Sequence, residues 1–244
     1  MRAALRPSSE PGCGPIANVV LGIIGLAIAA AIAIPNIMGP TCRGGNETAA
    51  IATLRNLASC QARFVTYGGV DLDGDGFGEY GTLGEMTGAT GVRSNAAGTL
   101  RGKPVAPPML SPALAGVGED GIVIKSGYCF RLFLPGRSGA VRERRPGEPF
   151  TGAVDTNRAE EEWCAYAWPV KYGNSGFRVF FVSQGGDVLQ AGNEDGRYDG
   201  RAKGPAWDAA MVTDGWSREW SGVAVGVVHG KAMSRDGLVW KVTN

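Results

Sequence analysis

Acidic side chains at alternate positions form the densest group of potential metal ligands in this chain. They lie in a glycine-rich stretch and comprise Asp71, Asp73, Asp75 and Glu79. Hard cations such as Ca²⁺ take several oxygen ligands, and alternation in a tight loop brings carboxylates together. The stretch matches the first half of the calcium-loop pattern D-x-D-x-D-G, with Gly76 at the turn. We therefore predict a calcium site formed by these four residues.

The second half of the stretch departs from that pattern. Thr82 stands where a calcium loop has a bidentate glutamate, and Glu85 follows three residues later. Groups from elsewhere in the chain would have to complete the site. The alternative interpretation is a solvated turn in which Asp and Gly simply suit tight geometry.

The cysteines indicate a disulfide more readily than a zinc site. There are five, and no two of them have the CxxC spacing of zinc ligands. Cys129 and Cys164 each lie in an apolar, strand-like segment. We expect a disulfide between them if the domain is exported, the alternative being two buried thiols. No pairing is predicted for Cys13, Cys42 and Cys60.

The composition does not favour nucleic-acid binding, histidine-based sites or catalysis. The formal net charge is +1, with acids and bases interspersed, so nucleic-acid binding is not expected. A single histidine argues against His-based metal sites and catalytic triads. The chain has no G-x-S-x-G motif and no P-loop, and we expect no enzymatic activity.

An uncharged apolar segment, residues 16–38, precedes all of these side chains. As a helix of about 23 residues it would span the ~30 Å hydrocarbon core of a bilayer. Arg2 and Arg6 precede it, which favours a cytoplasmic N-terminus and an exported C-terminal domain. Pro35 lies inside the segment and is expected to kink the helix.

A second helical pattern follows the breakers Gly44 and Gly45, with Asn46 as the predicted N-cap. Its side chains recur at helical spacing and place Ile51, Leu54, Leu57, Gln61 and Phe64 on one face. We predict an amphipathic helix that docks on a globular domain. The predicted organisation is a leader at 1–15, an N-terminal helix at 16–64 and a globular β-rich head at 65–244.

Beyond residue 120 the pattern becomes strand-like. A hairpin is predicted around Ser126 and Gly127, and further strands are predicted at 163–170, 178–183 and 188–191. The predicted fold class is α+β, with a long N-terminal hydrophobic helix followed by an antiparallel sheet with long loops.

Several segments together resemble the type IV pilin and pseudopilin family. They are the apolar segment ending AAAIAIPN, the following NETAAIATLRNLASCQARF, and the later DLDGDGFGEYGTLGEMTG, GYCFRLFLPG, WCAYAWPVKYGNSGFRVFFVSQGGDVLQ and DGLVWKV. The resemblance covers most of the chain. It implies a structural subunit that polymerises through its N-terminal helix into an extracellular pilus-like filament or a secretion pseudopilus.

The leader junction differs from the pattern of that family, in which a Gly precedes the cut and a Glu stands fifth in the mature chain. Cys13 and Asn18 take those two positions here, and Gly12 and Gly14 flank the expected cut. Asn18 can form a hydrogen bond but supplies no charge. The residues expected to act in assembly or processing are Gly12, Gly14, Asn18 and Pro35.

The resemblance also implies partners and a location. The expected partners are copies of the chain itself in a helical filament, the inner-membrane assembly machinery and a prepilin peptidase. The chain would reside in the inner membrane before assembly and at the cell surface afterwards. The competing hypothesis is a single-span, membrane-anchored, calcium-binding ectodomain.

Overall fold

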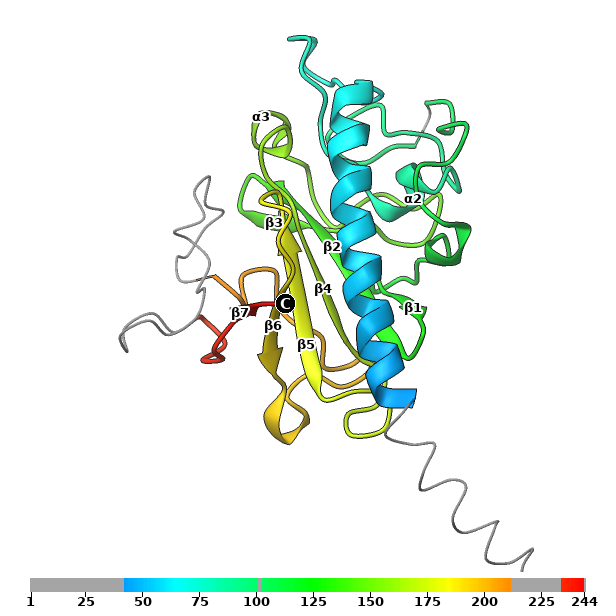
Figure 1. Cartoon of the computed structure of the whole chain (residues 1–244). Helices are drawn as coiled ribbons and strands as arrows, with labels where there is room; N and C mark the ends of the chain where they lie inside the picture. The colour runs from blue at the N-terminus through cyan, green and yellow to red at the C-terminus, as the bar shows by residue number, and fades with distance from the viewer. Residues whose placement is uncertain (1–41, 101, 212–233, 244) are drawn as a thin grey trace, which may run out of the picture. The chain divides into compact units, whose positions relative to one another are not determined.

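The computed structural model describes residues 42–100, 102–211 and 234–243. The first described element is a helix over residues 42–67, referred to below as the long helix. It lies across one face of a β-sheet, where Figure 1 draws it in blue and cyan. Its buried side chains recur at three- and four-residue intervals and comprise Ala50, Leu54, Leu57, Cys60 and Phe64. Of the face that the helical periodicity predicts, Leu54, Leu57, Gln61 and Phe64 are buried and Ile51 is partly buried.

Among the described residues the sheet has seven strands, and every pair of neighbouring strands is antiparallel. The strands are β1 (Val123–Lys125), β2 (Tyr128–Gly136), β3 (Gly139–Val141), β4 (Cys164–Pro169), β5 (Arg178–Ser183), β6 (Leu189–Gly192) and β7 (Lys241–Val242). Their order is β1-β2-β4-β5-β6-β7, and β3 pairs with β2. Short helices lie in the connections: α2 (Leu83–Met86), α3 (Thr156–Ala159) and the 3₁₀ helices η1 (Pro112–Leu114) and η2 (Glu194–Gly196).

The strand predictions made from local sequence are confirmed at β1–β2, β4, β5 and β6. The β1–β2 turn is formed by Ser126 and Gly127, with φ angles of 48° and 72°. Positive φ at both central residues is typical of the two-residue hairpin turn that matches strand twist. The predicted hairpin therefore forms where the turn residues placed it.

Both faces of the sheet are buried. The face beneath the long helix contributes Phe130, Leu132, Ala165, Ala167, Phe180 and Val182 to one core cluster. The opposite face contributes Cys129, Phe133, Cys164, Tyr166, Trp168 and Phe181 to a second cluster, with Tyr198, Ala210, Met211 and Trp240 from later segments. Burial on both sides explains why β4 and β5 read as almost continuous apolar runs instead of alternating ones.

The predicted fold class is wrong about its first element, the long N-terminal hydrophobic helix. No helix within the described residues is long and apolar enough to cross a membrane. The helix that precedes the sheet is amphipathic, because it buries one stripe while Arg55 and Arg63 are exposed on other faces. The segment over residues 16–38, for which a hydrophobic helix was predicted, lies outside the described residues.

The start of the long helix also differs from the prediction. The described part of the helix includes residue 42, Gly44 and Gly45, and Asn46 lies inside it instead of capping it. Side chains in its first turns bond to a distant loop, as described below, and these bonds compensate for two weak helix formers. One compact unit covers Arg43–Asn244 and includes the long helix and the sheet.

Candidate functional site

The acidic loop, residues 71–79, follows the long helix and projects beyond the end of that helix (Figure 1). Asp71 organises the turn, since its Oδ1 accepts the Gly74 amide at 2.8 Å and its Oδ2 accepts the Gly76 amide at 3.2 Å. Gly74 and Gly76 have φ angles of 75° and 92°, a region that favours glycine. Asp75 Oδ1 accepts the amide of Phe77 at 2.8 Å. The Asp and Gly residues thus set the backbone of the loop.

Three of the four predicted ligands meet in this loop. One carboxylate oxygen from each of Asp71, Asp73 and Asp75 lies within 4.8 Å of the others, and all three residues are exposed. Converging carboxylate oxygens at a loop suit a hard cation.

Glu79, the fourth predicted ligand, is directed into the interior. It is 1% exposed, and its Oε2 lies 2.9 Å from Arg93 Nη2. Its Oε1 accepts the Leu72 amide at 2.9 Å. Burial raises the pKa of Glu79 above its ordinary value, although Arg93 acts in the opposite direction. Glu79 thus fixes the base of the acidic loop.

A different glutamate approaches the aspartates from a remote part of the sequence. Oε1 of Glu160 is buried and has no hydrogen-bond partner. Burial raises the pKa of Glu160 to about 7, and the nearby charges of Asp75 and Asp73 act in the same direction. Glu160 and Phe77 also line a hollow of about 420 Å³. Local sequence patterns do not reveal this approach, because 85 positions separate Asp75 from Glu160.

Arg93 is the centre of a buried polar network beneath the acidic loop. Besides Glu79, it contacts Glu85 through Nη1 and Oε2 at 2.6 Å, and neither side chain of that pair is exposed. Its Nη2 also donates to the Tyr80 carbonyl at 2.7 Å. Thr82 and Glu85 form a capping box at the start of α2. Sequence reasoning missed this network, although the T-x-x-E spacing of the capping box is a readable signal.

Glu143 caps α2 from a distant loop. Its Oε1 accepts the Leu83 amide at 2.9 Å, and its Oε2 accepts the Gly84 amide at 3.0 Å. Burial raises the pKa of Glu143 to about 7, and the charge of Glu85 acts in the same direction. A carboxyl that titrates near neutral pH therefore stands at the base of the network.

The first turns of the long helix are fastened to the loop between β4 and β5. Arg43 Nη1 donates to the Gly173 carbonyl at 2.7 Å, and its guanidinium lies 5.1 Å from the ring centroid of Phe177. Asn46 Nδ2 donates to the Ser175 carbonyl at 3.1 Å. These bonds join the helix to residues about 130 positions later, which local sequence patterns do not reveal.

Glu47 completes this connection, which we call the helix clamp (Arg43, Asn46, Glu47 and Arg178). Its Oε1 accepts the Phe177 amide at 2.8 Å and its Oε2 lies 2.6 Å from Arg178 Nη2. Glu47 is 7% exposed. The clamp joins the start of the long helix to the start of β5.

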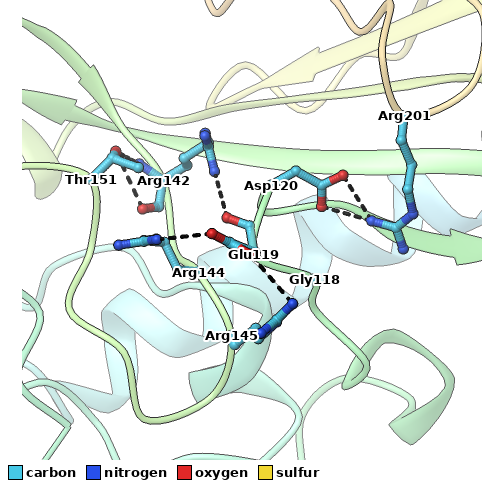
Figure 2. Close-up of a pocket in the computed structure, with 8 residues that line it drawn as sticks. All are labelled: Gly118, Glu119, Asp120, Arg142, Arg144, Arg145, Thr151 and Arg201. Carbon is cyan, nitrogen blue, oxygen red and sulfur yellow. Dashed lines mark hydrogen bonds and ion pairs between the residues drawn. The ribbon is translucent and has the colours of Figure 1, made fainter.

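A second concave region, the basic hollow, contains no residue of the acidic loop; Figure 2 shows the side chains that line it. It has a volume of about 810 Å³ and is lined by Gly118, Glu119, Asp120, Arg142, Arg144, Arg145, Thr151 and Arg201. Figure 2 shows the arginines arranged around the two acidic residues. The sequence analysis predicted no site here, because Arg201 joins the others only through the fold.

A protein-family model matches more than half of the chain. The chain belongs to the DUF2950 family. The model of this family, described as a protein of unknown function, matches residues 41–196. The match contains the long helix, the acidic loop, the Arg93 network and the strands from β1 to β6. Neither the curated proteins nor the solved structures gave a match.

The predicted disulfide between Cys129 and Cys164 does not form. Both cysteines are free and buried. On the paired strands β2 and β4, Cys129 lies opposite Trp168, whereas Cys164 lies opposite Phe133. Four residues of strand therefore separate them, about 13 Å along the sheet. A disulfide needs Cα atoms within about 7 Å, so the register excludes the bond.

The remaining predicted residues lie outside the part of the chain that the structure describes. They are Gly12, Gly14, Asn18 and Pro35, together with Cys13. Cys42 and Cys60 are both free and lie on the one long helix. At about 1.5 Å per residue, their separation along the helix is about 27 Å.

Proposed function

We propose that this chain is a structural subunit of an extracellular filament, either a pilus-like fibre or a secretion pseudopilus. Assembly would use the uncharged segment of residues 16–38, which leads directly into the described domain. A segment of this length without charge is costly to leave in water, and association with copies of itself removes it from water. The resemblance of several segments to pilins supports the same proposal.

The helix clamp is the observation that carries the proposal. A filament subunit must transmit force from its assembly segment to its exposed domain. Arg43, Asn46 and Glu47 hold the start of the long helix on the loop before β5 through charged and backbone hydrogen bonds. A flexible linker at this point would instead let the domain swing. The clamp therefore fixes the first described turns of the long helix on the domain, as a subunit that receives force through this helix would require.

The burial of the sheet on both faces supports the proposal further. The long helix covers one face, and segments around Ala210 and Trp240 contribute to the core on the other. A domain with one core on each side of an antiparallel sheet resists local opening, because its central strands β2, β4 and β5 are held by backbone bonds and by two layers of side chains.

An assembly experiment with matched variants tests the proposal. The full chain is purified in a non-ionic detergent, the detergent is removed, and sedimentation and electron microscopy report fibres. We expect fibres from the native chain and from Ser59→Asp, which places a charge on the exposed side of the long helix. We expect none from Ile28→Asp, because it places a charge in the apolar segment. Fibres from Ile28→Asp, or a monomeric native chain, would contradict the proposal.

Mass spectrometry of the N-terminus in cells extends this test. Removal of the leader near Gly12 and Gly14 would support processing of the kind that pilins undergo. A retained leader together with a chain that stays monomeric in the membrane fraction would contradict the filament proposal.

Calcium binding by the acidic loop is a second candidate function, and it is compatible with the first. The convergence of Asp71, Asp73 and Asp75 within 4.8 Å favours it. The buried, unpartnered oxygen of Glu160 also favours it, because a cation nearby would compensate this carboxylate. Exposed loop sites of this kind bind calcium with dissociation constants of about 10⁻⁴ to 10⁻³ M.

Calorimetry with the full chain in calcium-free buffer tests this candidate. We expect saturable heat and a higher melting temperature with calcium for the native chain. Asp73→Asn should abolish both, because it removes one of three converging charges. Asp187→Asn removes an exposed aspartate between β5 and β6 and should leave both unchanged. Absence of heat and of a thermal shift in the native chain at about 10 mM calcium would exclude a site of this affinity class.

A further inference from the structure

The basic hollow carries more positive than negative charge. Four arginines and two acidic residues line it: Arg142, Arg144, Arg145, Arg201, Glu119 and Asp120. Since the whole chain has a formal net charge of only +1, the excess in the hollow is a local concentration of positive charge. Such a concave surface attracts anions more strongly than dispersed charges do.

The two acidic residues compensate this charge unequally. Arg201 Nη1 lies 2.7 and 2.9 Å from the two carboxylate oxygens of Asp120, a close pair. The Glu119 carboxylate is held more loosely, at 3.4 Å from Arg144 and 3.3 Å from Arg145. Strong guanidinium–carboxylate contacts are about 2.7–2.9 Å long. Replacing the Glu119 carboxylate with another anion at this position therefore requires little free energy.

Arg142 adds a guanidinium that no carboxylate satisfies. Its Nη1 donates to the backbone carbonyl of Glu119 at 3.2 Å, and it forms no ion pair with any residue that the structure describes. Figure 2 shows its side chain above Glu119, on the side opposite Arg145. An anion at the position of the Glu119 carboxylate would thus face three guanidinium groups.

Arg131, on β2, adds to the positive potential near the hollow. Its guanidinium lies 5.4 Å from the ring centroid of Trp168, and its Nε is buried without a hydrogen-bond partner. Burial lowers the pKa of Arg131 to about 10, and the charges of Arg142 and Arg201 act in the same direction. Arg131 thus adds positive charge near the hollow, which Glu148, at 3.3 Å from Arg144, offsets in part.

We propose that the basic hollow binds a small polycarboxylate, one carboxylate of which replaces the Glu119 side chain among Arg142, Arg144 and Arg145. A carboxylate is the expected group because guanidinium groups already hold one at this position, and their planar donors match it. A volume of about 810 Å³ leaves room for further anionic groups of the ligand. This site is independent of the filament proposal.

Titration calorimetry on the full chain tests the site, with citrate as the polycarboxylate probe and inorganic phosphate and acetate as comparisons. We expect saturable citrate binding that is tighter than phosphate binding and far tighter than acetate binding. Arg145→Gln should weaken citrate binding about tenfold or more, because it removes a charge-assisted contact. The Arg145 side chain is 61% exposed, so its replacement should not disturb folding. Arg142→Gln should weaken binding similarly.

Two further variants separate a site from general charge attraction. Glu119→Gln should tighten citrate binding, because it removes the internal competitor and keeps the shape of the side chain. Arg63→Gln removes one exposed positive charge on the long helix, outside the hollow, and should leave binding unchanged. No saturable citrate binding below about 10 mM would overturn the proposal. So would equal effects of Arg63→Gln and Arg145→Gln, or phosphate binding as tight as that of citrate.

Discussion

Nη2 of Arg93 lies 2.9 Å from Oε2 of Glu79, and neither side chain is exposed. Because Arg93 also contacts Glu85 at 2.6 Å, this single guanidinium joins the acidic loop to α2. Glu79 in turn accepts the amide of Leu72, at the start of the loop. The conformation of the three aspartates therefore depends on an arginine that follows them in the sequence.

Replacement of Arg93 should destabilise the fold severely. Arg93→Met leaves Glu79 and Glu85 buried without their positive partner, and breaking a buried ion pair costs about 3–5 kcal/mol. Urea unfolding monitored by tryptophan fluorescence measures the loss. The control Arg63→Met, on the exposed side of the long helix, should change the free energy of unfolding by about 0.5 kcal/mol or less. A loss below about 1 kcal/mol in Arg93→Met would show that the pair contributes little.

Stability should fall as pH rises from about 4.5 to 7. The pKa of Glu143 in the folded chain is raised to about 7, so the folded state binds more protons than the unfolded state across this window. Protonated Glu143 therefore adds to the free energy of unfolding at about pH 4.5, and this contribution is lost as the pH rises through 7. For one buried group this amounts to about 3 kcal/mol.

The contribution of Glu143 can be isolated by urea unfolding at several pH values. Glu143→Gln cannot ionise and should flatten the pH dependence between 4.5 and 7, although it exchanges one acceptor for a donor and lowers stability throughout. Glu160→Gln should flatten the dependence further, because the pKa of Glu160 is also raised to about 7. An unchanged slope in both variants would contradict the assignment.

The cysteines should behave as free thiols of very different accessibility. Cys42 is exposed, whereas Cys129 and Cys164 are buried, and burial raises the pKa of Cys129 to about 11. Iodoacetamide labelling of a Cys13→Ser chain, read by peptide mass spectrometry, should modify Cys42 first. Labelling of Cys129 and Cys164 should require urea. Dithiothreitol should not change the melting temperature; a shift of several degrees would indicate a disulfide.

Loosening the helix clamp should affect the start of the long helix more than its end. Glu47→Ala removes the acceptor for the Phe177 amide and the partner of Arg178. Hydrogen exchange should then accelerate over residues 43–50 and in the loop before β5, with little change over residues 57–64, which pack on the sheet. Asp187→Asn should leave both regions unchanged. Uniform acceleration along the helix would show that the clamp has no local role.

Features set by neighbouring residues could be predicted from the sequence. The helical stripe from Ala50 to Phe64, the Ser126–Gly127 hairpin and the meeting of three aspartates all depend on local spacing. The amphipathic helix was placed correctly over most of its length. Asn46 was predicted as its N-cap but lies inside it, and the contacts of Arg43 and Glu47 with residues about 130 positions away could not be read from local sequence.

Features set by long-range register could not be predicted. Cys129 and Cys164 lie on adjacent strands and on the same face, as a disulfide would require, but the pairing of Cys129 with Trp168 separates them. Glu79 matched a ligand position, yet Arg93 provided a stronger partner in the interior. The basic hollow likewise depends on the fold, which brings the segment before β1, the segment after β3 and Arg201, from beyond β6, together.

Electron cryomicroscopy of material sheared from cells that produce the chain tests the filament proposal most directly. We expect helical fibres in which residues 16–38 form the interior and the domain of residues 43–244 forms the outer surface, with the helix clamp intact within that domain. Ile28→Asp should abolish the fibres while Ser59→Asp retains them. A chain found only as monomers, with no fibres in the sheared material, would contradict the account.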